Sequence, residues 1–249
     1  MQRIVSVVPS QTELLHALGL EREVVGITKF CVHPAEWFQT KLRIGGTKTL
    51  NLEKIAALEP DLIIGNKEEN EREQIEWLSA RFPVWISDIY TLEDALDMIV
   101  QVGDLCGRPT QAALLHAQIR EAFAALDAGV RGQAPLRVAY YIWRKPFMVA
   151  ARHTFIEDML GRAGFENVFG HLERYPEVLR EDLEMANPDI ILLSSEPFPF
   201  SEKHVAEFQD ICPSVRVEIV DGEMFSWYGN RLLKSAAYFL ELRQKLKRL

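Results

Sequence analysis

The sequence lacks long hydrophobic runs and is poor in cysteine. Of its 249 residues 48% are hydrophobic, but no apolar run approaches the roughly 20 residues that a transmembrane helix needs. Its three cysteines, Cys31, Cys106 and Cys212, lie far apart, and none belongs to a CxxC or Cys/His spacing of a zinc site. The odd number also argues against a complete disulfide framework. These absences argue against a membrane-spanning, disulfide-stapled or zinc-stabilised protein.

Positive charge is also in short supply. The chain has 28 Lys and Arg against 36 Asp and Glu, for a net charge of −8. Because phosphate binding needs clustered Lys and Arg, nucleic acid is not expected as the main partner. No Walker loop, GxSxG elbow or HExxH is present, so the sequence predicts a protein that is not an enzyme and has no intrinsic cofactor. We expect a monomer.

The chain opens directly on a strand-like segment. Residues 4–8 are apolar and β-branched, and Pro9-Ser10 follows them. A signal peptide would have a longer apolar stretch and a small-residue cleavage site. From the residues alone we therefore expect a protein that is either cytoplasmic or supplied without its leader.

Short β-branched runs alternate with helical patterns along the chain. Strands buried on both faces are predicted at residues 4–8, 24–28, 62–65, 84–87, 138–143, 190–194 and 217–220. Helices are predicted at residues 12–18, 52–58, 71–80 and 91–105. This alternation predicts an α/β fold with parallel sheets and crossover helices.

One segment breaks the alternation. From residue 109 to about residue 127 the sequence is rich in Ala and has Pro109 near its first turn, which predicts a helix of about 28 Å. The strand–helix alternation then restarts. We therefore predict an N-terminal α/β lobe at residues 1–106, a connecting long helix at 107–130 and a C-terminal α/β lobe at 131–249.

The second half of the chain repeats a pattern of the first. Residues 53–64 align with residues 181–192 at a constant spacing of 128, and each segment has a Pro-Asp turn before a buried strand. A weaker echo pairs residues 14–19 with 159–164. Helix–turn–strand units can look alike by composition alone, but the shared register favours two related lobes. A small-molecule cleft between the lobes is the expected site.

The order of motifs resembles a known family. The segment Arg3-Ile-Val-Ser-Val-Val-Pro-Ser-Gln-Thr-Glu-Leu-Leu-His-Ala-Leu-Gly19 is followed by Val24-Val-Gly-Ile-Thr, His33-Pro, Gly45-Gly-Thr and Leu58-Glu-Pro-Asp-Leu-Ile-Ile64. This series resembles the substrate-binding proteins of ABC importers for vitamin B12 and iron–siderophore complexes, and is most similar to the cobalamin-binding branch. The resemblance covers nearly the whole chain, including the long helix that joins two lobes in that family.

The resemblance implies a receptor rather than a catalyst. Such a protein captures a cobalamin-type corrinoid or another metal chelate between its lobes and delivers it to the permease of an ABC importer. It implies a periplasmic or other extracytoplasmic location, although the absence of a leader leaves a cytoplasmic one open. The alternative is a cytoplasmic enzyme or chaperone of corrinoid or metal metabolism that reuses the bilobal fold.

Candidate ligand contacts lie in loops that follow the carboxyl ends of the predicted strands, where open parallel sheets bind ligands. A flat, largely apolar macrocycle suits aromatic faces with a few polar groups. The predicted contacts are Ser10, Thr12, Phe30, Lys67, Trp143, Arg144, Phe147, Glu196, Phe198, Trp227 and Tyr228. For Trp143 core packing is an equal alternative, whereas the loop position of Trp227 and Tyr228 favours ligand contact. Ser10 and Thr12 could simply cap a helix.

Three further groups of residues are candidates for anion contact, metal binding and permease docking. A basic set, Arg144, Lys145, Arg152 and Arg174, could meet ligand carboxylates or phosphate. Cys31 and His33 are weak candidates for a metal or for the cobalt of a corrin, against the alternative of a buried thiol and a loop histidine. The family resemblance suggests that surface glutamates meet permease arginines. Our docking candidates are Glu71, Glu73 and Glu202, although carboxylates also stabilise helix N-termini.

Overall fold

The computed structural model describes residues 2–247, which divide into two compact units. Unit 1 consists of the chain up to Ile89, Glu93–Gln118 and Tyr228–Arg231. Unit 2 consists of Tyr90–Leu92, Ile119–Trp227 and the chain from Leu232 onward. Each unit has its own sheet, so the predicted α/β fold with parallel sheets is confirmed. The predicted domain boundaries at residues 106 and 130 stay a prediction.

Unit 1 is built on a five-stranded sheet in the order β3-β2-β1-β4-β5, in which all neighbours are parallel. Its strands are β1 (Ile4–Ser6), β2 (Val24–Ile27), β3 (Leu42–Arg43), β4 (Leu62–Asn66) and β5 (Val84–Ser87). Its helices are α1 (Pro9–Ala17), α2 (Ala35–Thr40), α3 (Leu52–Ala57), α4 (Arg72–Ser79) and most of α5 (Leu92–Leu105).

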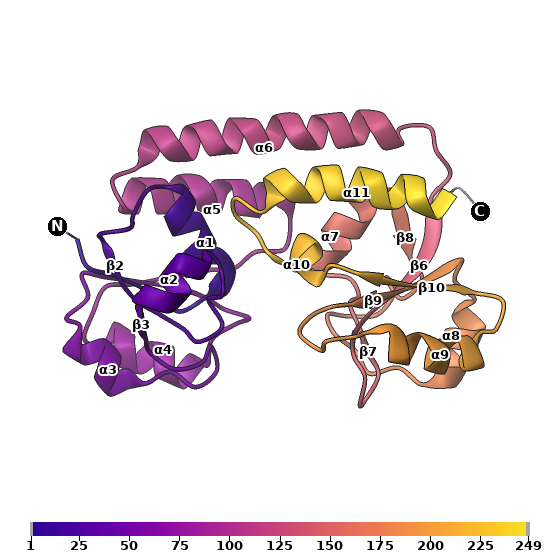
Figure 1. Cartoon of the computed structure of the whole chain (residues 1–249), viewed down its shortest axis with the longest axis horizontal. Helices are drawn as coiled ribbons and strands as arrows, with labels where there is room; N and C mark the ends of the chain where they lie inside the picture. The colour runs from indigo at the N-terminus through magenta and orange to yellow at the C-terminus, as the bar shows by residue number, and fades with distance from the viewer. Residues whose placement is uncertain (1, 248–249) are drawn as a thin grey trace. The chain divides into compact units, whose positions relative to one another are not determined.

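Both faces of the unit 1 sheet are covered. Val5 and Ile63 face a cluster that includes Ile55 of α3 and Leu78 of α4. Helices α1 and α5 lie on the other side of the sheet (Figure 1). Strands β1 and β4 are buried along their whole length, which is why their sequences are mostly apolar and end in the small or polar residues Ser6 and Asn66.

Unit 2 has a sheet in the order β10-β9-β6-β7, with β8 paired to β6. The strands are β6 (Leu136–Trp143), β7 (Met148–Val149), β8 (Phe165–Asn167), β9 (Ile190–Ser194) and β10 (Arg216–Val220), and only β7 is antiparallel to its neighbour. The helices are α7 (Phe155–Arg162), α8 (Arg180–Ala186), α9 (Glu202–Ile211), α10 (Gly222–Ser226) and α11 (Leu232–Lys247). Helix α6 (Pro109–Val130) begins in unit 1 and ends in unit 2.

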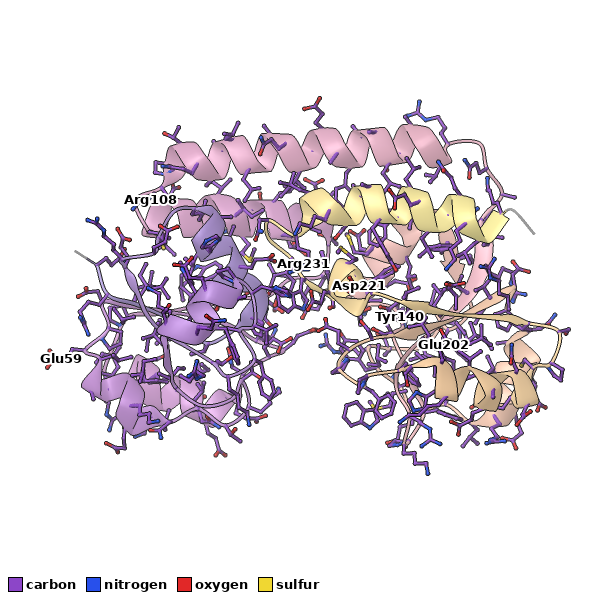
Figure 2. All side chains as sticks on the ribbon, in the orientation of Figure 1. Glu59, Arg108, Tyr140, Glu202, Asp221 and Arg231 are labelled. Atoms are coloured by element: carbon purple, nitrogen blue, oxygen red, sulfur yellow. The ribbon has the colours of Figure 1, made fainter. Side chains whose placement is uncertain are left out.

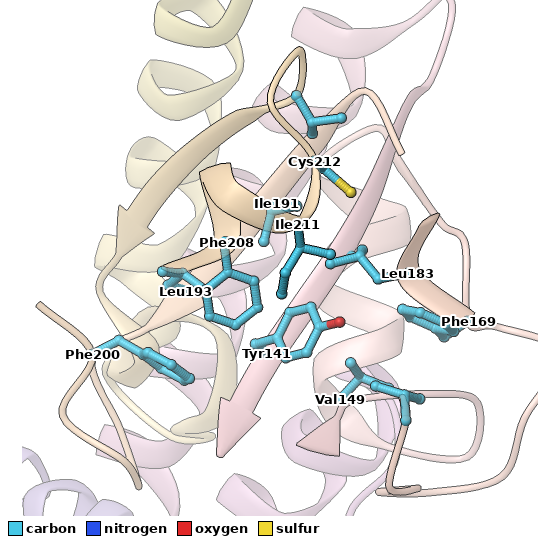
Figure 3. Close-up of a cluster of buried hydrophobic side chains, with 13 residues drawn as sticks. Tyr141, Val149, Phe169, Leu183, Ile191, Leu193, Phe200, Phe208, Ile211 and Cys212 are labelled. Atoms are coloured by element: carbon cyan, nitrogen blue, oxygen red, sulfur yellow. The ribbon is translucent and has the colours of Figure 1, made fainter. Parts of the chain in front are cut away.

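The core of unit 2 is rich in aromatic side chains. On one face of the sheet Tyr141 packs against Phe208 of α9, with their ring centroids 4.7 Å apart, in a cluster that includes Leu183 of α8 (Figure 3). On the other face Tyr140 packs against Phe225 of α10, with a centroid distance of 5.0 Å. The sheet is therefore covered on both faces, as in unit 1.

The seven predicted strands are all present, but some helix ends differ from the prediction. The helix predicted at residues 12–18 begins at Pro9, because a proline suits the first turn of a helix. Its N-cap is therefore Val8, which makes no side-chain capping bond, and the prediction that Ser10 or Thr12 caps this helix is wrong. Strands β3, β7 and β8, each of two or three residues, were not predicted.

No helix within residues 2–247 has both the length and the apolar character that crossing a bilayer requires.

Candidate functional site

Each sheet has a point where the order of its strands reverses. In unit 1 this point lies between β1 and β4, and in unit 2 between β6 and β9. Loops that leave the carboxyl ends of such strands turn away in opposite directions and leave a crevice in which open α/β sheets bind ligands. The candidate site of each unit therefore lies at the loops that follow these strands.

In unit 1, Ser10 and Thr12 lie in the first turns of α1 and are buried. The Thr12 Oγ1 lies 2.9 Å from the Val8 carbonyl oxygen, 2.8 Å from the Ser6 Oγ and 3.0 Å from the Cys31 Sγ. Its hydrogen-bonding capacity is thus used inside unit 1. This arrangement favours a structural role for Thr12 over ligand contact.

Cys31, one of the two weak metal candidates, is fully buried beside Thr12 and Thr28. Burial raises the pKa of its thiol, so the thiolate that a metal would need is disfavoured at neutral pH. No group of three or more His, Cys, Asp or Glu side chains within residues 2–247 could hold a metal ion. Within the described residues, Cys31 and His33 therefore do not belong to a group that could hold a metal ion.

Two predicted ligand residues of unit 1 are accessible. Phe30 is 51% exposed in the loop after β2, and the Lys29 Nζ lies 5.0 Å from the centre of its ring. Lys67 follows β4, and its Nζ lies 2.5 Å from the Asp88 Oδ2 at the end of β5. Unit 1 thus presents one exposed aromatic face and a lysine whose charge is balanced by a carboxylate.

The carboxyl edge of the unit 2 sheet is aromatic. Trp143, the last residue of β6, is 38% exposed, and its ring meets the Phe198 ring edge-on at 5.7 Å. The Trp143 Nε1 donates to the Lys145 carbonyl oxygen at 3.1 Å, which fixes the ring. Phe147 lies 5.7 Å from Tyr141 and 5.1 Å from Phe208 between ring centroids, so it joins this edge to the core. We call Trp143, Phe147 and Phe198 the aromatic edge.

The predicted basic set is largely paired within unit 2. The Arg144 Nε lies 2.7 Å from the Glu207 Oε2. Arg152 pairs with Glu173, and the Arg174 guanidinium lies over the rings of Tyr90 and Tyr175 at 5.8 and 5.7 Å. These partners balance or screen the positive charges that were expected to meet anionic groups of a ligand.

A hollow of about 460 Å³ lies at the carboxyl ends of β9 and β10. It is lined by Ser195, Glu196, Ile219, Val220, Asp221 and Glu223. Glu196, a predicted ligand residue, accepts a hydrogen bond from the Ser226 hydroxyl. Asp221 and Glu223 were missed at the sequence level, although Asp221 directly follows β10 (Figure 2). The lining of this hollow is therefore acidic.

Trp227 and Tyr228 lie just after α10, where the loop position favoured ligand contact. Each is only 7% exposed. Their burial favours packing, which is the more common role of large aromatic residues, over an open ligand surface.

The three docking candidates all lie at helix N-termini. Glu71 is the N-cap of α4, and one of its carboxylate oxygens lies 3.5 Å from the Lys48 Nζ. Glu73 is exposed in the first turn of the same helix. Glu202 is exposed at the first residue of α9 (Figure 2). Their positions suit the helix dipole as well as a partner.

Parallel sheets with accessible loops at their reversal points define a ligand-binding α/β protein. The sequence of residues 4–210 matches the family described as periplasmic binding protein, and the chain belongs to this family. Its members are binding proteins rather than enzymes, as the sequence predicts, and the alternative of an enzyme or chaperone is not favoured.

Individual relatives carry more specific names. The chain is 27% identical over 239 residues to a vitamin B12-binding protein of Pectobacterium carotovorum, covering 94% of this chain and 86% of that one. Its fold is similar to the periplasmic vitamin B12 binding protein BtuF of Vibrio cholerae, with a TM-score of 0.86, 22% identity and coverage of 100% and 98%. It is also similar to the periplasmic heme binding protein HutB of Vibrio cholerae, with a TM-score of 0.83, 21% identity and 99% coverage of both chains.

Proposed function

We propose that this chain is the receptor of an ABC importer and that it binds a cobalamin-type corrinoid at the carboxyl edges of its sheets. The observation that carries the proposal is the aromatic edge of unit 2, where an accessible indole is held in place beside Phe198. Such faces suit a flat macrocycle with an apolar surface. Family membership and the names of the relatives support a chelate as the ligand class.

Charge favours a corrinoid over haem within that class. Arg144 is paired with Glu207 and Lys67 with Asp88, and further carboxylates of Glu196 and Glu68 follow β9 and β4. The charges of Arg144 and Lys67 are therefore balanced, and Asp221 and Glu223 after β10 add negative charge to the unit 2 edge. Haem carries two propionate carboxylates, which this charge disfavours, whereas the rim of a corrin carries neutral amides.

The receptor role implies a cellular location and a protein partner. The family description is periplasmic, and we propose that the chain acts outside the cytoplasm as a monomer. Its partner is the permease of an importer, and its cargo is a metal chelate rather than a resident cofactor.

A titration followed by tryptophan fluorescence tests this function. Cyanocobalamin, cyanocobinamide, haem and a ferric siderophore are each added to the purified chain. Because Trp143 is accessible at the aromatic edge, corrinoids are expected to quench fluorescence saturably with a Kd of about 1 μM or below. Haem is expected to bind more weakly. The absence of any saturable response to the four chelates would reject the proposal.

Two variants, each with one tryptophan replaced, test where the ligand binds. Trp143→Phe is expected to remove much of the quenching while it keeps an aromatic face. The matched control is Trp77→Phe, because Trp77 lies on α4 with Arg81 stacked 3.8 Å from its ring centre. Equal loss of quenching in both variants would argue against ligand contact at the aromatic edge.

Charge swaps test the docking surface. Glu73→Lys and Glu202→Lys are each expected to weaken binding to the permease complex about tenfold, because they would oppose basic residues on the partner. The measurement is surface plasmon resonance against the cognate permease in nanodiscs, together with the Kd for cyanocobalamin, which should not change. Glu121→Lys, a swap at an exposed glutamate on α6, is the control. Unchanged permease binding in both variants would rule these glutamates out.

A further inference from the structure

Two buried asparagines lie at the carboxyl end of β4 in unit 1. Asn66 is 1% exposed and Asn70 is 5% exposed. A buried amide is costly unless its donors and acceptor are satisfied. In both residues every side-chain polar atom has a partner, so the two side chains form a satisfied polar pair rather than a strained one.

Asn70 joins three segments of unit 1. Its Nδ2 donates to the Val7 carbonyl oxygen after β1 at 3.2 Å and to the Thr47 carbonyl oxygen at 3.1 Å. Its Oδ1 accepts from the Asn66 backbone N–H at 2.9 Å. Gly65 leaves room for this amide, since a Cβ there would lie 2.7 Å from the Asn70 Oδ1.

Asn66 holds the loop that follows it. Its Oδ1 accepts from the backbone N–H groups of Glu68 at 2.9 Å and Glu69 at 3.2 Å. Its Nδ2 donates to the Ser87 Oγ at 3.0 Å, at the end of β5. The same hydroxyl lies 2.6 Å from the Nε2 of Gln11 in α1. The pair therefore links the ends of β1, β4 and β5, on both sides of the reversal point.

The repeated half of the chain has other side chains at these two positions. At the spacing of 128 residues, Ser194 stands where Asn66 does and Phe198 where Asn70 does. Ser194 keeps one bond of the pattern, because the Glu196 N–H donates to its Oγ at 3.4 Å. Unit 2 thus closes the corresponding turn with a hydroxyl and an aromatic ring.

We infer that Asn66 and Asn70 are positioning residues of the ligand site, which hold the loop bearing Lys67 in its binding geometry before the ligand arrives. Pre-ordering removes the entropic cost of fixing this loop on binding. The asparagine amides hold this loop in place without adding charge to an edge that already carries the carboxylates of Glu68 and Asp88. This inference rests on the proposed function, because it assumes that the carboxyl edge of unit 1 contacts the ligand.

The variant Asn70→Asp tests the inference. It keeps an oxygen for the Asn66 N–H but loses both donors, so an ionised carboxylate faces the carbonyl oxygens of Val7 and Thr47. That surrounding raises the pKa of the new carboxyl, and protonation at low pH restores one donor. We expect the Kd for cyanocobalamin to rise about tenfold at pH 8 and to recover to within about threefold of the wild type at pH 5.

The wild-type profile over the same range serves as the baseline. The segments around Asn70 also carry Lys48, Glu69 and Glu71, and the wild type contains the same groups. Cyanocobalamin has no group that titrates in this range. The matched control is Asn167→Asp in unit 2, where the Asn167 Nδ2 donates to the Ala150 carbonyl oxygen at 2.8 Å and to the Glu157 carboxylate at 2.5 Å. Asn167 pairs with Val138 near the start of β6, so this change should lower stability but not affinity.

Two outcomes overturn the inference. The first is an Asn70→Asp variant that melts earlier but binds with wild-type affinity at every pH, which would leave only a structural role. The second comes from amide hydrogen exchange without ligand. In Asn66→Ala the amides of Glu68 and Glu69 should exchange faster, and unchanged exchange rejects a positioning role even if no corrinoid binds. Failure of the wild type to bind any chelate rejects the proposed function separately.

Discussion

The two units are alike at the amino ends of their strands. In unit 1 the Arg3 N–H donates to the Asp61 carboxylate at 2.7 Å, and the Asp61 N–H donates to the Arg3 carbonyl oxygen at 2.8 Å. In unit 2 Arg137 and Asp189 make the same two bonds, both at 2.8 Å. The repeated Pro-Asp turn is therefore a hydrogen-bonded clasp that joins β1 to β4 in unit 1 and β6 to β9 in unit 2.

At the carboxyl ends the units differ. Unit 1 uses the polar pair Asn66 and Asn70, whereas unit 2 uses Ser194 and the aromatic Phe198 at the corresponding positions. Residues that build the frame are thus kept between the halves, and residues at the edge that we assign to the ligand are not. The difference teaches that one frame supports a buried polar network at this edge in unit 1 and an aromatic edge in unit 2.

The weaker repeat, residues 14–19 and 159–164, is preceded in both units by a carboxylate that makes a similar contact. Glu13 of α1 precedes Leu14-Leu15, and Asp158 of α7 precedes Met159-Leu160. Glu13 forms a two-bonded ion pair with Arg231, at 2.9 Å for both bonds, which secures residues 228–231 to unit 1. Asp158 accepts the Leu92 N–H at 2.7 Å and secures residues 90–92 to unit 2. Each unit therefore holds a segment from elsewhere in the chain with a helix carboxylate.

The largest expected effect comes from breaking the ion pair of unit 1. Glu13 and Arg231 are 8% and 5% exposed, so Arg231→Met leaves a buried carboxylate without its cation. We expect the free energy of unfolding to fall by about 3–5 kcal/mol. Urea denaturation followed by circular dichroism measures it.

Asp158→Ala is the comparison in unit 2. Because the Asp158 side chain is partly exposed, its loss should cost only about 1–2 kcal/mol. The double variant Glu13→Leu/Arg231→Met should recover most of the loss, since it removes both buried charges. If Arg231→Met lowers the free energy of unfolding no more than Asp158→Ala does, the contacts of Glu13 and Asp158 are equivalent, and burial does not distinguish them.

A smaller effect tests the shared frame. Asp61→Ala and Asp189→Ala each remove one acceptor for a backbone N–H, so each should lower the free energy of unfolding by about 1 kcal/mol. The two losses should agree within about 0.5 kcal/mol if the clasps are equivalent. Chemical denaturation of the two single variants measures this. A loss confined to one unit would contradict the equivalence of the repeat.

The frame was predictable from sequence because its signals are local. Buried parallel strands read as apolar β-branched runs, and the Pro-Asp turn recurs at a fixed spacing, so strands at residues 84–87 and 190–194 were located to the residue. The short strands β3, β7 and β8 were missed, because two or three residues carry no periodicity.

The site was less predictable because its contacts are distant in sequence. Arg144 was assigned to ligand anions, yet its partner Glu207 lies 63 residues further on. The role of Asn70 depends on carbonyl oxygens of Val7 and Thr47, which no spacing in the sequence reveals. Trp227 and Tyr228 follow a short helix, and only the structure shows that they are buried. Loop position indicated where to look, but tertiary contacts decide which side chains remain accessible.

The smallest expected effect is a pH dependence of stability that arises from His204, near the aromatic edge of unit 2. His204 of α9 is buried, with its ring 5.3 Å from Phe198 and 5.6 Å from Phe200, and its Nδ1 accepts the Ser201 N–H at 2.9 Å. Burial lowers its pKa, and the positive charges of Lys203 and Arg144 act in the same direction. The neutral form is therefore favoured in the folded protein, so its contribution to stability is complete above the unfolded pKa of about 6.5 and is lost as pH falls through the lower folded value.

The variant His204→Gln isolates this contribution, because glutamine at the third position of a helix can accept the same N-cap bond without titrating. We expect the melting temperature of the wild type to fall more between pH 7 and pH 5 than that of His204→Gln, as measured by differential scanning calorimetry. Because the two proteins differ only at His204, the difference should arise from unit 2, and hydrogen exchange at the two edges can locate it. Equal pH dependence in the variant and the wild type would mean that protonation of His204 does not destabilise the folded protein, and the prediction would be wrong.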